Sequence, residues 1–139
     1  MDLSVVLVSY RSPGLLLAGL RALRADAAGA GLALDIVVVD NDSRDGTLEA
    51  LAREAPDVRV LANRENAGYA RAVNQGLAAT GGEFTLVLNP DCEVHAGALR
   101  ALLGHMAAGP RAGLVGPRIV NPDGSLEYSA RSFPDPFTF

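Results

Sequence analysis

The stretch LSVVLVSYRSPG at residues 3–14 decides the fold. Residues 3–8 are almost all apolar and rich in valine, which is typical of a strand buried on both faces. Ser12 and Pro13 then provide an N-cap and a proline at the first helical position. An apolar helix face follows at Leu16, Leu20, Leu23 and Ala27, and the helix ends at Gly29 and Gly31. A buried strand that leads into an amphipathic helix predicts an α/β domain.

The same alternation of strand and helix continues along the chain. Further strands are predicted at 36–39, 58–61 and 84–88. The helices between and after them are predicted from apolar faces at Leu48, Leu51, Ala52 and Ala55 (closed by Pro56), at Ala70, Val73 and Leu77 (ending at Gly81–Gly82), and at Leu99, Leu102, Leu103 and Met106. This order predicts a mainly parallel sheet flanked by helices.

The last part of the chain predicts a β-hairpin. Leu114, Val115 and residues 119–120 are expected to be extended, and Asn-Pro-Asp-Gly at 121–124 is typical of a type I turn. Residues 125–132 then return as an antiparallel strand. The predicted fold class is therefore α/β, with a mainly parallel sheet and a C-terminal β-hairpin.

Composition excludes several classes of protein. The 139 residues are 49% hydrophobic and 20% charged, as expected of one packed domain rather than a disordered chain. The net charge is −4 and no block of basic residues occurs, so a nucleic-acid partner is not expected. No apolar run approaches the roughly 20 residues that cross a bilayer. Cys92 is the one cysteine, which excludes an intrachain disulfide and favours a reducing, cytoplasmic setting.

Polar residues follow each predicted strand of the sheet. They are Ser9-Tyr10, Asp40-Asn41-Asp42, Asn66-Ala67-Gly68 and Asn89-Pro90-Asp91. In open parallel sheets, ligands bind at the carboxyl ends of the strands, so we expect these four groups to surround one site.

Each group also has a plainer interpretation. Asp40 could accept a hydrogen bond from the imide N–H of uracil or thymine, or it could cap its own loop. Asp91 could be an oxygen ligand of a hard divalent cation, or an ordinary turn residue. Gly68 and Arg71 could hold an anion at a helix N-terminus, or mark a helix start with a solvated arginine. His95 and His105 lack the partners of a catalytic or metal-binding arrangement.

Taken together, four segments resemble family 2 glycosyltransferases with the GT-A fold. They are VVLVSYR at 5–11, VVVDNDS at 37–43, NAGYARAVNQG at 66–76 and LVLNPD at 86–91. The L-N-P-D form, followed by G-x-x-x-P at 113–117 and the N-P-D-G turn, is most similar to the rhamnosyltransferase-like branch of that family.

The resemblance implies roles for individual residues. Val8, Ser9, Tyr10 and Asp40 would hold the nucleobase of a sugar donor. Asn66, Gly68 and Arg71 would contact the base and the diphosphate, and Asn89 completes the donor-binding set. The family's Asp-x-Asp metal motif falls on 89–91, where Asn89 replaces the first aspartate. Asp91 alone would then be the carboxylate ligand of Mg²⁺ or Mn²⁺.

The resemblance also implies an activity. The enzyme would transfer a sugar, rhamnose by its branch, from a UDP- or dTDP-linked donor to a glycan or lipid-linked acceptor, with inversion. Such a role in cell-envelope polysaccharide synthesis would place it in the cytoplasm or peripherally at the inner face of the membrane. No residue after Asp91 matches the family's acidic general-base motif, so the catalytic base is unknown. Residues 1–139 are therefore expected to be one nucleotide-sugar-binding domain, cut before the acceptor segment and inactive alone.

Two alternatives come from other classes. One is a sugar-phosphate nucleotidyltransferase, although residues 9–14 match its basic glycine-rich loop poorly. The other is a non-catalytic α/β interaction module. The aromatic residues Phe133, Phe137 and Phe139 could also mediate self-association.

Overall fold

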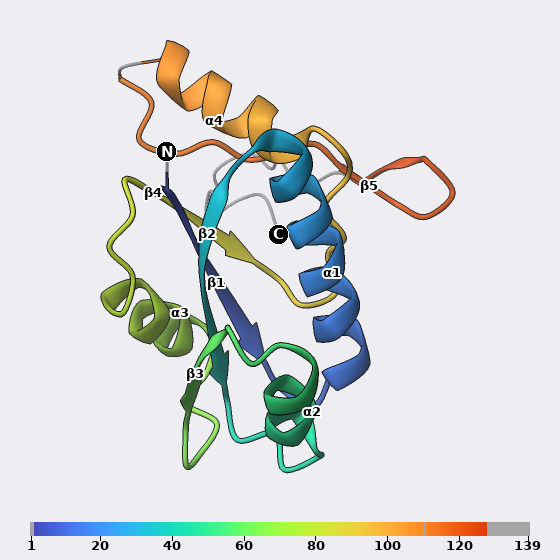
Figure 1. The fold of residues 1–139 in the computed structure, drawn as a ribbon, viewed down its shortest axis with the longest axis vertical. Helices are drawn as coiled ribbons and strands as arrows, with labels where there is room; N and C mark the ends of the chain where they lie inside the picture. Colours follow the sequence, from blue (N-terminus) through green and yellow to red (C-terminus); the bar gives the residue numbers. More distant parts are fainter. Residues whose placement is uncertain (1, 110, 128–139) are drawn as a thin grey trace, which may run out of the picture.

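A computed structural model describes residues 2–109 and 111–127 (Figure 1). Its centre is a four-stranded sheet in the order β3-β2-β1-β4. The strands are β1 (Asp2–Ser9), β2 (Ala33–Asp40), β3 (Arg59–Ala62) and β4 (Phe84–Leu88), and every pair is parallel. The predicted parallel α/β fold is confirmed.

The strand β1 lies in the middle of the sheet and sets its register. It pairs with β2 along its whole length, so that Ser9 stands opposite Asp40. On its other side Leu7 stands opposite Leu88, the last residue of β4. The loops that follow β1, β2 and β4 therefore leave the sheet at the same edge.

The helices lie on both faces of the sheet (Figure 1). Helices α1 (Pro13–Ala30), α2 (Thr47–Glu54) and α4 (Ala98–Ala108) are on one face, and α3 (Tyr69–Ala78) is on the other. Right-handed crossovers explain this division, because the chain moves from β1 to β3 in one direction and then back across the sheet to β4. This reversal makes the carboxyl ends of β1 and β4 a topological switch point, where α/β proteins bind ligands.

The larger core lies between the sheet and the face that carries α1. The predicted apolar face of α1, at Leu16, Leu20, Leu23 and Ala27, is fully buried there. Gly31, with φ 67°, ends α1, whereas Gly29 lies inside it. Ser12 occupies the N-cap position but makes no side-chain capping bond, so that detail of the prediction was wrong.

The helix α3 packs on the sheet through its smallest residues. The predicted contact face, Ala70, Val73 and Leu77, is exposed or half-buried, and Ala72 and Gly76 are buried instead. A Cβ atom on Gly76 would lie 2.3 Å from Cγ1 of Val6. The prediction failed because it counted large apolar side chains, whereas close approach of the helix to the sheet requires small ones.

Three other predictions need correction. In α2, Leu48 and Ala52 are exposed, and Thr47 and Ala50 join Leu51 in the core. Leu114 and Val115 lie outside any strand. The observed strands also begin or end up to three residues from the predicted bounds, which is ordinary for strand ends.

The C-terminal hairpin is confirmed within the described residues. Strands β5 (Ile119–Val120) and β6 (Leu126–Glu127) pair antiparallel. The turn between them is closed by the Gly124 N–H, which donates to the Asn121 carbonyl at 2.8 Å. The rest of the predicted strand, 128–132, and the aromatic tail lie outside the described residues.

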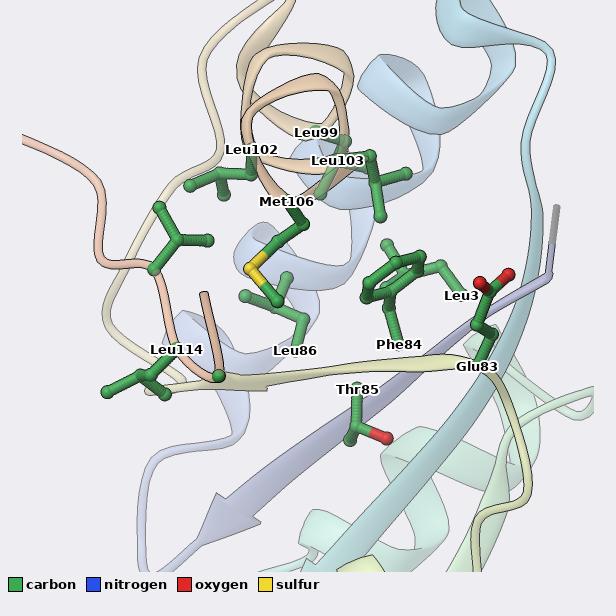
Figure 2. Close-up of a pocket in the computed structure, with 12 residues that line it drawn as sticks. Leu3, Glu83, Phe84, Thr85, Leu86, Leu99, Leu102, Leu103, Met106 and Leu114 are labelled. Atoms are coloured by element: carbon green, nitrogen blue, oxygen red, sulfur yellow. The ribbon is translucent and has the colours of Figure 1, made fainter. Parts of the chain in front are cut away.

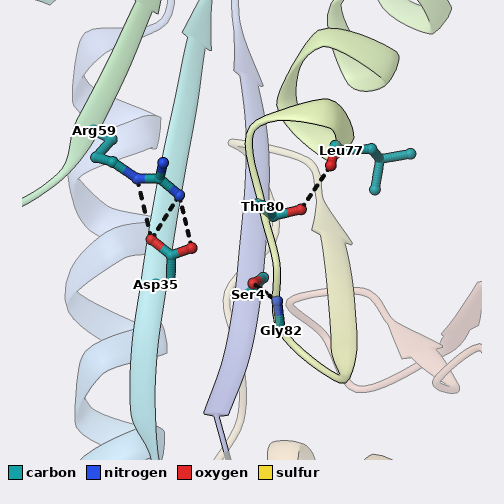
Figure 3. A network of polar contacts seen from close by, with 6 residues as sticks. All are labelled: Ser4, Asp35, Arg59, Leu77, Thr80 and Gly82. Atoms are coloured by element: carbon teal, nitrogen blue, oxygen red, sulfur yellow. Dashed lines mark hydrogen bonds and ion pairs between the residues drawn. The ribbon is translucent and has the colours of Figure 1, made fainter.

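Polar contacts fix the end of the sheet where β1 begins (Figure 3). Arg59 donates three hydrogen bonds to Asp35 across β2 and β3. The buried hydroxyl of Ser4 accepts a hydrogen bond from the Gly82 N–H at 3.0 Å, which holds the connection between α3 and β4. In the part of the chain that the structure describes, no helix has the length and apolar character needed to span a membrane.

Candidate functional site

The loops after β1 and β2 are joined by two hydrogen bonds. The Asn41 N–H donates to the Ser9 carbonyl at 2.8 Å, and the Arg11 N–H donates to the Ser43 hydroxyl at 3.0 Å. The first two predicted polar groups therefore form one continuous surface.

Both loops contain backbone in the left-handed region. Arg11, Asp42 and Arg44 have φ values of 56°, 67° and 51°, and they are the non-glycine residues with positive φ in the described ranges. Such conformations cost about 1–3 kcal/mol and cluster at functional sites. Their confinement to these two loops marks this edge of the sheet as the candidate site.

Asp40 lies at the bottom of this edge with only 2% of its surface exposed. One carboxylate oxygen accepts the Ser43 N–H at 3.2 Å, and the other accepts the Ser43 hydroxyl. Each oxygen has a second lone pair that can accept another hydrogen bond. Asp40 therefore caps its own loop, as the plainer interpretation predicted, and it keeps the capacity to accept an N–H from a ligand.

The predicted residues at the end of β1 differ in how far they reach the surface. Val8 is in the core that faces α3, so only its backbone is available to a ligand. Ser9 is fully buried, and its hydroxyl has no hydrogen-bond partner among the described residues. Tyr10 is 43% exposed, and the Arg11 guanidinium lies 4.9 Å from the centre of its ring. Of the three predicted residues, Tyr10 therefore provides the accessible side chain.

The loop before α3 presents donors toward the same edge. The Asn66 side-chain oxygen accepts hydrogen bonds from Asn41 Nδ2 at 2.8 Å and from the Gly68 N–H at 3.0 Å. Gly68, with φ 82°, precedes the first residue of α3, and Arg71 is exposed on the first turn. A helix N-terminus beside an exposed arginine favours a negatively charged ligand.

The turn after β4 is connected to this loop and to α1. The Tyr69 hydroxyl donates to the Asn89 side-chain oxygen at 2.8 Å. On the other side, a Cβ on Gly19 would lie 3.2 Å from the Pro90 carbonyl oxygen, so α1 touches the turn backbone directly. Partial burial, followed by the nearby Cys92 and Asp91, raises the pKa of Tyr69 above its usual value, so its hydroxyl keeps its proton at neutral pH.

Asp91 is exposed at this turn and is the carboxylate predicted to bind a metal ion. Within residues 2–109 and 111–127, no group of three or more His, Cys, Asp or Glu side chains could form a metal site alone. Mg²⁺ commonly takes one or two protein carboxylates and completes its shell with phosphate oxygens and water. The donor set at Asp91 fits a cation that arrives with a diphosphate.

Cys92 is a poor additional ligand at this turn. Partial burial and the carboxylate of Asp91 raise the pKa of the Cys92 thiol, and Glu127 adds to the effect. The thiolate that would bind a metal is therefore disfavoured.

The structure thus gathers all nine predicted site residues around one edge of the sheet, although Val8 and Ser9 are buried. Three further residues connect the loops: Asn41, Ser43 and Tyr69. Asn41 was expected at this edge within the polar group 40–42 but was given no binding role, and Ser43 and Tyr69 were not predicted as site residues. Asn41 and Ser43 follow the buried β2 directly, and polar residues at that position were the signal that could have identified them.

An apolar pocket of about 240 Å³ lies elsewhere, between α4 and the start of β4 (Figure 2). Phe84 and Leu86 face Leu103 and Met106 across it. The pocket is lined by Glu83 and by residues 84–86 of β4, whereas the four polar loops lie beyond the other end of that strand. It is therefore separate from the candidate site.

Comparison of the sequence with known proteins gives one family. Residues 4–139 match the family described as glycosyl transferase family 2. The chain is 37% identical over 143 residues to an N-acetylglucosaminyl-diphospho-decaprenol L-rhamnosyltransferase of Mycobacterium tuberculosis, covering 95% of this chain and 46% of that protein. It is 32% identical to the succinoglycan biosynthesis protein ExoO of Rhizobium meliloti, covering 88% and 35%. The chain spans about half the length, or less, of these relatives.

Solved structures give the same fold. A mannosyltransferase of Pyrobaculum calidifontis, in complex with GDP-Man and Mn²⁺, superimposes with a TM-score of 0.68 at 25% identity, covering 87% of this chain and 36% of that one. S. aureus TarS in complex with UDP-GlcNAc superimposes with a TM-score of 0.64 at 23% identity, covering 79% and 32%. These similarities confirm the predicted GT-A fold.

Proposed function

Because the chain belongs to glycosyl transferase family 2, we propose that it binds the nucleotide of a sugar donor at the carboxyl edge of its sheet. The predicted similarity to the rhamnosyltransferase-like branch is confirmed by the relative at 37% identity. The nucleotidyltransferase alternative has no comparable support.

The whole enzyme would transfer a sugar, rhamnose by similarity, from a UDP- or dTDP-linked donor to a glycan or lipid-linked acceptor. Transfer with inversion requires a base to take the proton of the acceptor hydroxyl as it attacks the anomeric carbon. The sequence after Asp91 does not match the acidic general-base motif of the family. Residues 1–139 would therefore supply donor binding, and we expect no sugar transfer by this chain alone.

One observation carries the proposal: hydrogen bonds connect all four polar loops in sequence around the sheet. Asn41 joins the ends of β1 and β2, its side chain joins the loop before α3, and Tyr69 joins α3 to the turn after β4. A site built from contacts between loops is preorganised, so that the loops lose little conformational entropy when a ligand binds.

The base and the diphosphate of a nucleotide each have a suitable group of residues at this edge of the sheet. Asp40, which can only accept hydrogen bonds when ionised, suits a base that offers an N–H, as uracil and thymine do. The exposed ring of Tyr10 suits contact with the face of the base. The α3 N-terminus with Gly68 and Arg71 suits the diphosphate.

Asp91, with Asn89 beside it, would hold a divalent cation together with the diphosphate oxygens. The P. calidifontis mannosyltransferase with GDP-Man and Mn²⁺ supports this assignment by analogy. Such a cation would offset the negative charge of the departing diphosphate. Because the protein contributes so few ligands, metal binding should depend on the nucleotide.

The experiment is calorimetric titration of UDP and dTDP, with and without Mn²⁺, into the 139-residue chain. We expect metal-dependent binding that Asp40→Asn and Asp91→Asn each weaken by about tenfold or more, equivalent to about 1.4 kcal/mol. Both substitutions keep the size of the side chain. Asp57→Asn is the matched control, because Asp57 is an exposed aspartate paired with Arg24 and belongs to none of the four loops.

Absence of nucleotide binding by the folded chain would contradict the proposed site. Binding that is unchanged in both site variants would place the nucleotide elsewhere. Sugar transfer catalysed by residues 1–139 alone would refute the assignment of this chain to donor binding only.

A further inference from the structure

We propose that Asn41 is a positioning residue for the donor nucleotide, acting through the loop at 63–68 without contacting the ligand itself. The inference rests on the proposed function, and it assigns a task to a residue that lies beneath the site. Asn41 is only 2% exposed, whereas Asn66 and Gly68, which it supports, are exposed.

The Asn41 side chain makes three hydrogen bonds to residues of the loop at 63–68. Its oxygen accepts hydrogen bonds from Asn63 Nδ2 at 3.0 Å and from the Ala67 N–H at 2.9 Å. Its nitrogen donates to the Asn66 oxygen at 2.8 Å. These bonds span 22 to 26 residues of sequence, so one buried amide fixes the loop after β3 against the end of β2.

The network continues to α3 and to β1. Asn63 and Gln75 exchange two hydrogen bonds, at 2.9 and 3.1 Å, which connects the loop to the buried side of α3. The Asn41 N–H donates to the Ser9 carbonyl. Asn41 therefore joins three of the four segments that form the proposed site.

An amide suits this position because its oxygen accepts two hydrogen bonds while its nitrogen, a separate atom, donates a third. An ionised aspartate could still accept from Asn63 and Ala67, but it would place an oxygen against the Asn66 oxygen. Rotation of the Asn66 amide would relieve that contact, and it would then turn an N–H group toward the Gly68 N–H. Either arrangement disturbs the backbone just before α3, where the diphosphate is proposed to bind.

The test compares Asn41→Ser and Asn41→Asp with the wild-type chain. Asn41→Ser removes the amide without adding charge, and Asn41→Asp keeps its size. We expect both variants to bind UDP or dTDP with Mn²⁺ about tenfold more weakly by calorimetry, and their Asn66–Gly68 amide resonances to shift in the free protein. If Asn41→Ser and Asn41→Asp lose similar affinity for the nucleotide, repulsion between the new carboxylate and the diphosphate cannot explain the loss.

The control is Asp26→Asn, which removes a buried polar contact between α1 and α4 and leaves the four loops intact. It should lose stability and keep its nucleotide affinity at a temperature where all variants are folded. Wild-type affinity in both Asn41 variants would overturn the positioning role alone, whereas failure of the wild-type chain to bind any nucleotide would overturn the proposed function with it. A loss of affinity in Asp26→Asn equal to that of Asn41→Ser would also overturn the inference, because general destabilisation would then explain the effect.

Discussion

Removal of the Asp26 carboxylate should weaken the attachment of α4 to α1 and destabilise the domain. Asp26, near the end of α1, is 7% exposed, and its two oxygens accept the N–H groups of Gly97 and Leu99. Gly97 is the N-cap residue of α4 and Leu99 lies in its first turn. Because glycine has no side chain, the N-cap residue cannot cap the helix itself. A carboxylate from another helix therefore caps α4 and lies at the positive end of its dipole.

The structure sets the size of the effect. A hydrogen bond to a charged group contributes about 1.5–3 kcal/mol, and the two bonds share one carboxylate and one local change of solvation. We therefore expect Asp26→Ala to lower the free energy of unfolding by about 2–4 kcal/mol. Asp26→Asn keeps one acceptor oxygen and should lose about half as much.

Urea unfolding followed by circular dichroism measures both losses. Asp57→Ala provides the comparison, because its ion pair with Arg24 is exposed and such pairs contribute about 0–1 kcal/mol. A loss for Asp26→Ala no greater than that for Asp57→Ala would show that the two hydrogen bonds to α4 do not stabilise the domain as expected. A wild-type free energy of unfolding for Asp26→Asn, together with a full loss for Asp26→Ala, would show that packing, and not the two hydrogen bonds, explains the effect.

Three other substitutions or conditions give independent tests. Gly76→Ala should destabilise the chain, because the contact with Val6 costs about 1–3 kcal/mol against a gain of about 1 kcal/mol in helix propensity; urea unfolding should show that Val6→Ala in the same chain gives less than the sum of the two single losses. Asn89→Asp can still accept the Tyr69 hydrogen bond and adds a second carboxylate, so in the presence of UDP it should bind Mn²⁺ more tightly by electron paramagnetic resonance. Unchanged Mn²⁺ affinity would argue against a metal at this turn. The raised pKa of Cys92 should make its alkylation by iodoacetamide in metal-free buffer slower near neutral pH than in urea, with the rate rising only above the usual thiol range. Asp91→Asn should move that rise to lower pH, and identical pH profiles for the native and unfolded chains would contradict the effect of partial burial on the thiol.

The sheet could be predicted because its central strands are continuous apolar segments in the sequence. The strands β1 and β2 are buried on both faces, and such strands are runs of valine and isoleucine rather than alternating patterns. Polar residues directly after them mark the carboxyl edge, which is where the structure gathers the candidate site. The face of α3 could not be predicted in this way, since Gly76 contacts the sheet by lacking a side chain.

The support beneath the site was also hidden from the sequence. Asn41 bonds to Asn63 and Asn66, which lie more than 20 residues away, and no local pattern pairs such amides. The bond from Ser43 to Asp40 is different, because an aspartate commonly caps a loop residue a few positions later. Local polar contacts could therefore be predicted as alternatives, whereas the network that joins separate loops required the fold.

The central claim is that four loops form one nucleotide site with a metal ion at Asp91. The most direct test is a ¹⁵N-resolved nuclear magnetic resonance titration of the chain with UDP or dTDP and Mg²⁺, followed by replacement of Mg²⁺ with Mn²⁺. We expect shifts confined to the loops at 9–11, 40–44, 66–71 and 89–92, and paramagnetic broadening strongest around Asp91. Shifts centred on the pocket beside Phe84 and Met106, or broadening that does not include Asp91, would contradict the central claim.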